Sequence, residues 1–174
     1  MDILFLGAAR EVTGSSYLLT VNGRSILIDC GMEQGKDTYE NQQLPISPAQ
    51  VDCVVLTHAH IDHSGMLPLL YKKGFRGAIY ATPATIELCD IMLRDSAHIQ
   101  EMDAEWKNRK ALRSGGTLHE PLYTQEDAES TMLLMRPASY VEDITILPGV
   151  ILKMKETEGV INSVPRMCGG DPSL

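Results

Sequence analysis

The stretch Thr57-His58-Ala59-His60-Ile61-Asp62-His63-Ser64-Gly65 decides how this chain is interpreted, because it places three imidazoles and one carboxylate within six residues. It follows directly after the apolar run 51–56, which is rich in β-branched residues. Such a run predicts a strand that is covered on both faces. The polar stretch therefore begins where a buried strand ends, which is a common place for a functional site.

Imidazole and carboxylate groups are natural ligands of zinc and similar divalent ions. In a loop that leaves a strand, His58 and His60 can point to the same side, while Asp62 and His63 start a helix and face a second position nearby. Four ligands spaced so closely do not easily surround one ion as a tetrahedron, so two adjacent ions are the better interpretation. The alternative, surface or capping histidines, fits poorly with three of the five histidines falling in one hexapeptide.

Asp29 is the second candidate site residue. It ends the predicted strand 24–29 and precedes Cys30 and Gly31. A carboxylate at the end of a strand can accept a hydrogen bond from a ligating imidazole and so select its tautomer. An ordinary turn-forming aspartate before glycine is the alternative interpretation.

The rest of the chain alternates between strand and helix patterns. Asn22-Gly23 lies between two apolar runs and predicts a tight β-hairpin. Thr82 with Pro83 predicts the start of a long helix that Ser114-Gly115-Gly116 ends, and Thr124 predicts the start of a helix that runs to about Met135. Further strands are expected at 2–6, 16–21, 78–81, 144–147 and 150–154, and a short helix from Met66 to Gly74. This order predicts an α/β fold in which a sheet is layered with helices.

Length and composition argue against several classes of function. The 174 residues carry 15 Lys and Arg against 23 Asp and Glu, and the net charge of −8 argues against a general polyanion binder. No apolar run is long enough to span a membrane, and the first residues do not resemble a signal peptide. The four cysteines form no C-x-x-C pair, so we expect reduced thiols and a cytoplasmic protein.

The histidine motif resembles a known family. Residues 58–63, preceded by Ile26-Leu27-Ile28-Asp29-Cys30-Gly31, resemble the H-x-H-x-D-H motif of the metallo-β-lactamase superfamily. Residues 7–15, 94–101 and 121–128 are similar, more narrowly, to the β-CASP branch of RNA-processing nucleases. The resemblance covers about residues 1 to 153.

The resemblance implies an αββα sandwich with two zinc ions. His58 and His60 would bind one ion, and Asp62 and His63 would bind the other. Asp29 matches the acidic residue of the family that lies behind the ligands, so the catalytic set would be Asp62, His63 and Asp29. The implied reaction is hydrolysis of an RNA phosphodiester bond through a metal-bound hydroxide.

The sequence also departs from the family pattern. The family places further His and Asp ligands downstream, and no such element follows Lys153-Met154-Lys155. We therefore expect residues 1–155 to form the N-terminal half of a metallo-β-lactamase domain in a truncated chain, with 156–174 as a divergent, disordered tail. An uncovered face of the sandwich would favour a homo-oligomer or another association.

Two other functions stay open at this point. One is a metallo-hydrolase of the same superfamily that acts on a thioester or a lactam. The other is a non-catalytic remnant, or a module that works with a partner. The stretch Arg10-Glu11-Val12-Thr13-Gly14-Ser15 favours the ribonuclease over the thioester hydrolase, because this stretch resembles the β-CASP branch.

Overall fold

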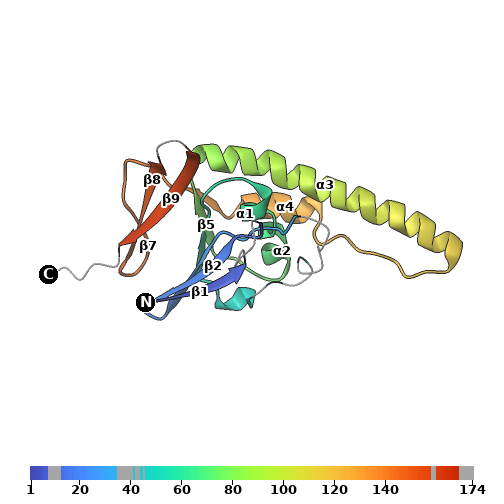
Figure 1. Cartoon of the computed structure of the whole chain (residues 1–174), viewed down its shortest axis with the longest axis horizontal. Helices are drawn as coiled ribbons and strands as arrows, with labels where there is room; N and C mark the ends of the chain where they lie inside the picture. The colour runs from blue at the N-terminus through green and yellow to red at the C-terminus, as the bar shows by residue number, and fades with distance from the viewer. Residues whose placement is uncertain (8–12, 35–40, 42–43, 45, 158–159, 169–174) are drawn as a thin grey trace, which may run out of the picture.

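The computed structural model describes residues 1–7, 13–34, 41, 44, 46–157 and 160–168. These residues form three layers: a group of helices, a six-stranded sheet, and a three-stranded sheet on the other side of it (Figure 1). Nine residues between 35 and 45, five residues of the 7–15 motif, residues 158–159 and the end of the chain, 169–174, lie outside the described residues. A metallo-β-lactamase-like α/β architecture is thus present, with three of the four layers of the expected sandwich formed by the described residues.

The large sheet combines antiparallel and parallel strands. Its order is β1-β2-β3-β4-β5-β6, in which β1 to β3 are antiparallel and β3 to β6 are parallel. Because β3 and β4 are parallel neighbours, their carboxyl ends lie at the same edge of the sheet, and the residues after them are adjacent. The strands are β1 (Asp2–Gly7), β2 (Ser16–Val21), β3 (Arg24–Ile28), β4 (Cys53–Val55), β5 (Ala78–Ala81) and β6 (Met135–Pro137).

The turn between β2 and β3 confirms the hairpin prediction. Val21 pairs with Arg24, so Asn22 and Gly23 are the two central residues. Their φ angles are +51° and +72°, the left-handed values that a type I′ turn requires. Asparagine and glycine tolerate this conformation best, which explains why the dipeptide is a reliable signal.

The two longer helices begin at the residues that the sequence indicates, and α3 also ends where it is expected to end. The Thr82 side chain accepts a hydrogen bond from the Thr85 N–H, and Gly115 ends the long helix in the left-handed conformation. Thr124 forms a capping box with Asp127. The helices are α1 (Ile61–Ser64), α2 (Leu67–Lys72), α3 (Pro83–Ser114) and α4 (Gln125–Met132), with a 3₁₀ turn, η2 (Pro48–Gln50).

The predicted extension of the last helix to Met135 is wrong. The helix ends at Met132, and Met135 begins β6, which pairs in parallel with β5. A three-residue strand is too short to show the alternation of apolar and polar residues that predicts a strand. Its conformation is determined by pairing with the neighbouring strand.

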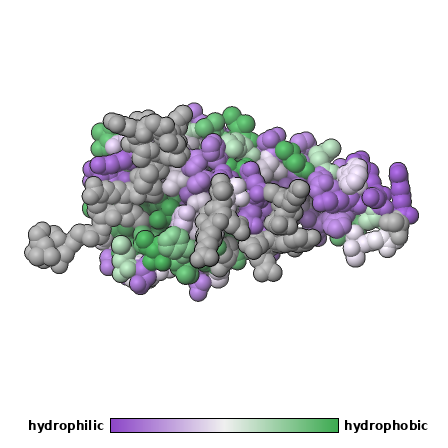
Figure 2. Space-filling model, viewed as in Figure 1, coloured by the Kyte–Doolittle hydropathy of each residue, from purple (hydrophilic) through white to green (hydrophobic). Residues whose placement is uncertain are grey.

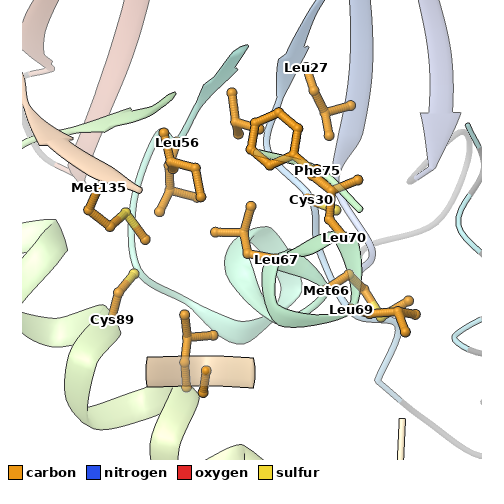
Figure 3. Close-up of a cluster of buried hydrophobic side chains, with 14 of the residues drawn as sticks. Leu27, Cys30, Leu56, Met66, Leu67, Leu69, Leu70, Phe75, Cys89 and Met135 are labelled. Carbon is orange, nitrogen blue, oxygen red and sulfur yellow. The ribbon is translucent and has the colours of Figure 1, made fainter. Parts of the chain in front are cut away.

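The two faces of the large sheet bury different side chains. Leu27 and Val54 pack against the helices, while Ile26 and Val55 pack against the second sheet. This alternation is the period of two expected for strands covered on both faces, and it confirms the prediction for 51–56. Figure 3 shows Leu67 of α2 at the centre of the helix-side cluster, with Met135 and Cys89 to one side and Phe75 and Cys30 to the other.

The second sheet includes residues that were expected to be disordered. It contains β7 (Ile144–Leu147), β8 (Val150–Thr157) and β9 (Val160–Cys168), and β9 pairs antiparallel with β8 from Val160 back to Cys168. Residues 160–168 therefore form a strand within the segment 156–174, where the sequence predicts a disordered tail. Valine and isoleucine at 160, 161 and 164 suit a strand, and β9 pairs with the side of β8 that β7 does not occupy. The division of the chain at residue 155 stays a prediction.

Several large apolar side chains are exposed. Ile3, Leu4 and Phe5 on the edge strand β1 are each more than half exposed, and others lie along α3. Figure 2 shows hydrophobic residues scattered between hydrophilic ones on this face of the molecule. In the described part of the chain, no helix is both long enough and apolar enough to cross a membrane.

Candidate functional site

The histidine motif lies at the carboxyl end of β4 and enters a single helical turn. His60 occupies the position before α1, with extended φ and ψ angles of −55° and 146°. The Ser64 hydroxyl donates to the carbonyl oxygen of Ala59 at 2.9 Å, which ties the end of this turn to the loop that enters it. Ser64 is fully buried, so the loop is held from its protein side, while His60 is exposed and His58 and His63 are half-buried.

Backbone hydrogen bonds join this motif to the segment that follows β3. The Cys30 N–H donates to the His63 carbonyl at 2.8 Å, and the Cys30 carbonyl accepts from the Met66 N–H at 2.9 Å. The Met32 N–H donates to the Ile61 carbonyl at 3.0 Å. Main-chain hydrogen bonds therefore hold together two segments that are about 30 residues apart in sequence.

Gly31 makes this close approach possible. A Cβ atom built on Gly31 would overlap the carbonyl oxygen of Asp62 and lie 2.7 Å from the Ser15 nitrogen. The Ser15 N–H donates to that same Asp62 carbonyl at 2.8 Å. Only glycine leaves room for the three segments to meet here, because it has no side chain.

Asp29 lies beneath the motif and is almost completely buried, with 1% of its surface exposed. One carboxylate oxygen accepts from the Thr57 N–H at 2.8 Å, and the other lies 2.7 Å from His63 Nδ1. The Thr57 hydroxyl lies 2.8 and 2.9 Å from the two oxygens, and the Ser15 hydroxyl lies 3.5 Å from one of them. A buried carboxylate needs such donors, and here both oxygens have them.

The imidazoles of His58 and His60 converge. His58 Nε2 lies 3.2 Å from His60 Nδ1, and the ring centres are 4.7 Å apart. Two nitrogens bound to one tetrahedral zinc ion, each at about 2.0–2.1 Å, are separated by about 3.3 Å. The pair therefore fits two positions around one divalent ion in both chemical type and spacing.

Asp62 and His63 form a second pair. His63 Nε2 lies 3.7 Å from an Asp62 carboxylate oxygen, and the His63 ring centre is 3.9 Å from that of His58. Within the ranges that the structure describes, no group of three or more His, Cys, Asp or Glu side chains is arranged to hold a metal ion. The residues thus offer two pairs of ligands, whereas a catalytic zinc ion usually takes three protein ligands.

Comparison with known proteins identifies the family. The family model described as the metallo-beta-lactamase superfamily matches residues 9–141, about three quarters of the chain, and this range includes the whole motif. The chain belongs to the metallo-beta-lactamase superfamily. Members of this superfamily bind metal ions, which agrees with the types of side chain that the site brings together.

Relatives of this metallo-beta-lactamase chain include RNA-processing proteins. It is 42% identical over 82% of its length to Ribonuclease TTHA0252 of Thermus thermophilus, and 38% identical over 55% of its length to Cleavage and polyadenylation specificity factor subunit 3-II of Arabidopsis thaliana. It is also 41% identical over 52% of its length to Transcription termination factor FttA of Methanosarcina mazei. The matches span only 29%, 17% and 15% of those proteins, so the chain corresponds to less than a third of each relative.

A solved structure supports the fold. The metallo-beta-lactamase fold protein YhfI from Bacillus subtilis superposes with a TM-score of 0.52, at 19% identity, over 96% of this chain and 58% of that protein. At this level of identity the likeness concerns the fold alone.

The charges around the site shift the pKa values of two histidines in opposite directions. Burial lowers the pKa of His58, and the neighbouring His63 lowers it further. For His63, burial also acts to lower the pKa, but the hydrogen bond and the charge of Asp29, together with Asp62, outweigh it and raise the pKa. His58 is therefore more readily neutral than His63, and only a neutral imidazole has a lone pair for a metal ion.

Thr57 is a site residue that the sequence analysis missed. The Thr57 hydroxyl donates a hydrogen bond to the Asp29 carboxylate. Its oxygen therefore accepts a hydrogen bond from His58 Nδ1 at 3.0 Å. This arrangement places the proton of neutral His58 on Nδ1 and leaves Nε2 to face His60. Its position directly before the motif was a signal, but a threonine after a strand has many ordinary roles.

His98 and His119, the two histidines outside the motif, are exposed. His98 lies on α3, and the backbone of His119 is hydrogen-bonded to the Asn108 side chain. In the motif, by contrast, the His58 ring contacts the rings of His60 and His63.

Proposed function

We propose that this chain provides the zinc-binding half of a β-CASP-type ribonuclease, an enzyme that hydrolyses RNA phosphodiester bonds. The observation that carries the proposal is the docking of the 58–63 motif on the buried Asp29, in a chain 42% identical to a ribonuclease over most of its length. When bound, divalent ions supply Lewis acidity toward a phosphoryl oxygen and make water a better nucleophile at neutral pH.

Each residue of the candidate site has a defined role in the proposed enzyme. His58 and His60 hold one ion through Nε2 and Nδ1, and His63 with Asp62 holds the second. Asp29 accepts a hydrogen bond from the Nδ1–H of His63 and so keeps the opposite nitrogen, Nε2, available as a ligand. Because the net charge of the chain is negative, residues outside this site would have to bind the phosphates of an anionic substrate.

A second candidate is a metal-binding module that becomes catalytic only with ligands from elsewhere. The number of ligands favours this second candidate, because the described residues offer two ligands to each ion and form no group of three. Such a module would bind zinc weakly and would not cleave RNA by itself.

One experiment separates the candidates. The zinc content of the purified 174-residue chain is measured together with cleavage of end-labelled single-stranded RNA, for the wild type, His60→Ala and His119→Ala. His119 is the matched control, since its side chain is exposed and its backbone is hydrogen-bonded to the Asn108 side chain. Zinc binding with cleavage that His60→Ala abolishes and His119→Ala preserves supports the ribonuclease.

The other outcomes are equally informative. Zinc binding that depends on His60 without RNA cleavage supports the module that needs further ligands. Hydrolysis of a thioester with no cleavage of RNA overturns the ribonuclease, and zinc content unaffected by His60→Ala overturns both candidates.

A further inference from the structure

The long helix α3 carries two apolar faces, and only one of them is buried. Its inner face packs into the protein through Cys89, Leu93, Ala97 and Ala104. The side turned away from the protein carries large apolar side chains that are about half exposed or more: Leu88, Ile91, Ile99, Met102 and Trp106. A row of this kind on one helix is more than the scattered apolar residues of an ordinary surface.

The spacing of this outer face is that of a helix pair. Leu88, Met92, Asp95, Ile99, Met102 and Trp106 follow one another in alternating steps of four and three residues. Five of them are exposed, and Met92 is half-buried because it also packs against the protein's own core. This spacing is the pattern of the seam between two packed helices, and it extends for about 27 Å at 1.5 Å per residue. We call these six residues the α3 seam. Figure 1 shows α3 lying along one edge of the molecule and extending beyond its body.

We propose that the α3 seam binds the same helix of a second copy of this chain, with the two helices antiparallel. The seam is complementary to itself in this direction. When Leu88 lies opposite Trp106 of the other copy, Met92 lies opposite Met102 and Asp95 lies opposite Ile99. Every apolar side chain then meets an apolar partner except at the centre, and one two-fold axis relates all the contacts.

The charges of α3 also favour the antiparallel direction. The helix is acidic over most of its length, with Glu87, Asp90, Asp95, Glu101, Asp103 and Glu105 against Arg94. Its last two turns are basic, with Lys107, Arg109, Lys110 and Arg113. Antiparallel pairing brings the basic end of one helix beside the acidic part of the other and places Glu87 level with Lys107. A parallel pair would bring like charges together.

Asp95 sets the register of this pair. It is the one charged residue of the α3 seam, and it is exposed. A polar residue at a single seam position lowers the affinity of a helix pair but selects one alignment. Replacing it with leucine would therefore strengthen the association, while a charge at Ile99 or Met102 would weaken it.

Sedimentation velocity of the full chain over a wide range of concentrations tests the proposal. We expect reversible dimers, a dissociation constant raised roughly tenfold or more in Ile99→Asp with Met102→Asp, and one lowered by roughly tenfold in Asp95→Leu. Phe5→Asp, on the exposed edge strand β1, is the matched control and should not change the constant. A monomer at every concentration overturns the proposal. So does a dimer that survives the α3 substitutions or is lost in Phe5→Asp.

Disulfide cross-linking tests the direction of the helices. Mixing Leu88→Cys and Trp106→Cys chains in a Cys168→Ser background should give a cross-linked heterodimer, because Cys30, Cys53 and Cys89 are buried. Leu88→Cys alone should not cross-link, since two copies of residue 88 lie at opposite ends of the antiparallel pair. Efficient cross-linking of Leu88→Cys with itself overturns the antiparallel arrangement. These outcomes do not depend on zinc or RNA and are independent of the proposed ribonuclease function.

Discussion

His63 Nδ1 lies 2.7 Å from a carboxylate oxygen of Asp29, a residue 34 positions earlier in the chain and almost fully buried. The contact joins the carboxyl ends of two parallel strands, β3 and β4. It leaves the second ring nitrogen of His63 facing Asp62. The arrangement is that of a metal-ligating histidine held by a carboxylate behind it.

Replacing Asp29 with asparagine should weaken zinc binding by about 10–100-fold, because the carboxylate behind a ligating histidine contributes that much in metal sites. Asparagine keeps the size of the side chain and tolerates the φ of +57° that Asp29 adopts, so the backbone is preserved. Competition with a chromogenic chelator measures the affinity. Asp2→Asn, at an exposed position of β1, is the control, and an Asp29→Asn chain with wild-type zinc affinity would contradict the role given to Asp29.

Thr57→Val should allow neutral His58 to populate both of its tautomers. Valine has the shape of threonine but no hydroxyl, so His58 Nδ1 loses the acceptor at 3.0 Å and Asp29 loses a donor. We expect imidazole nitrogen NMR shifts of the zinc-free chain to report a mixture of tautomers, and the free energy of unfolding to fall by about 1–3 kcal/mol.

Thr57→Ser is the matched variant, because it restores the hydroxyl and removes only a methyl group. It should return both the tautomer and most of the stability. If valine and serine have the same effect on the nitrogen shifts, then the Thr57 hydroxyl does not select the tautomer.

The parts of the fold that depend on residues close together in the sequence could be predicted from the sequence. The Asn22-Gly23 turn, the Thr82 cap and the Gly115 end are local features, and all are confirmed. The strand β6 was missed because its pairing with β5 is a contact between distant segments. For the site, the motif indicated the ligand types, but the hydroxyl of Thr57 acquires its role only when Asp29 is placed below it.

Asp52 should stabilise the fold in a pH-dependent way. It accepts from the Ser25 N–H at 2.8 Å and from Arg24 at 2.8 Å, which joins the starts of β3 and β4. The Ser25 hydrogen bond and, to a lesser extent, Arg24 lower the pKa of Asp52, although partial burial opposes this. A lowered pKa contributes stability above the unfolded value of about 3.9, and this contribution is lost as the pH falls through the folded pKa.

Asp52→Asn should therefore lower the free energy of unfolding by about 1 kcal/mol near neutral pH, and the difference from the wild type should shrink in strong acid. Urea denaturation at several pH values measures it. Glu105→Gln, at an exposed position of α3, is the control for removing a negative charge. A difference that stays constant from neutral to acid pH would assign the loss to the shape of the side chain and not to its charge.

Gly31→Ala should disturb the site through the backbone. The added methyl group would overlap the Asp62 carbonyl oxygen and crowd the Ser15 nitrogen, and neither of these main-chain groups can rotate away. Overpacking of this kind costs about 1–3 kcal/mol, so thermal unfolding should shift downward. Zinc binding should weaken too, because the clash pushes the Asp62 and His63 turn away from β3. Gly23→Ala is the comparison: nothing lies within 4 Å of its added carbon, so only the left-handed φ of +72° is penalised. It should lose stability while keeping its zinc affinity, and equal losses of zinc affinity in the two variants would contradict a local clash at Gly31.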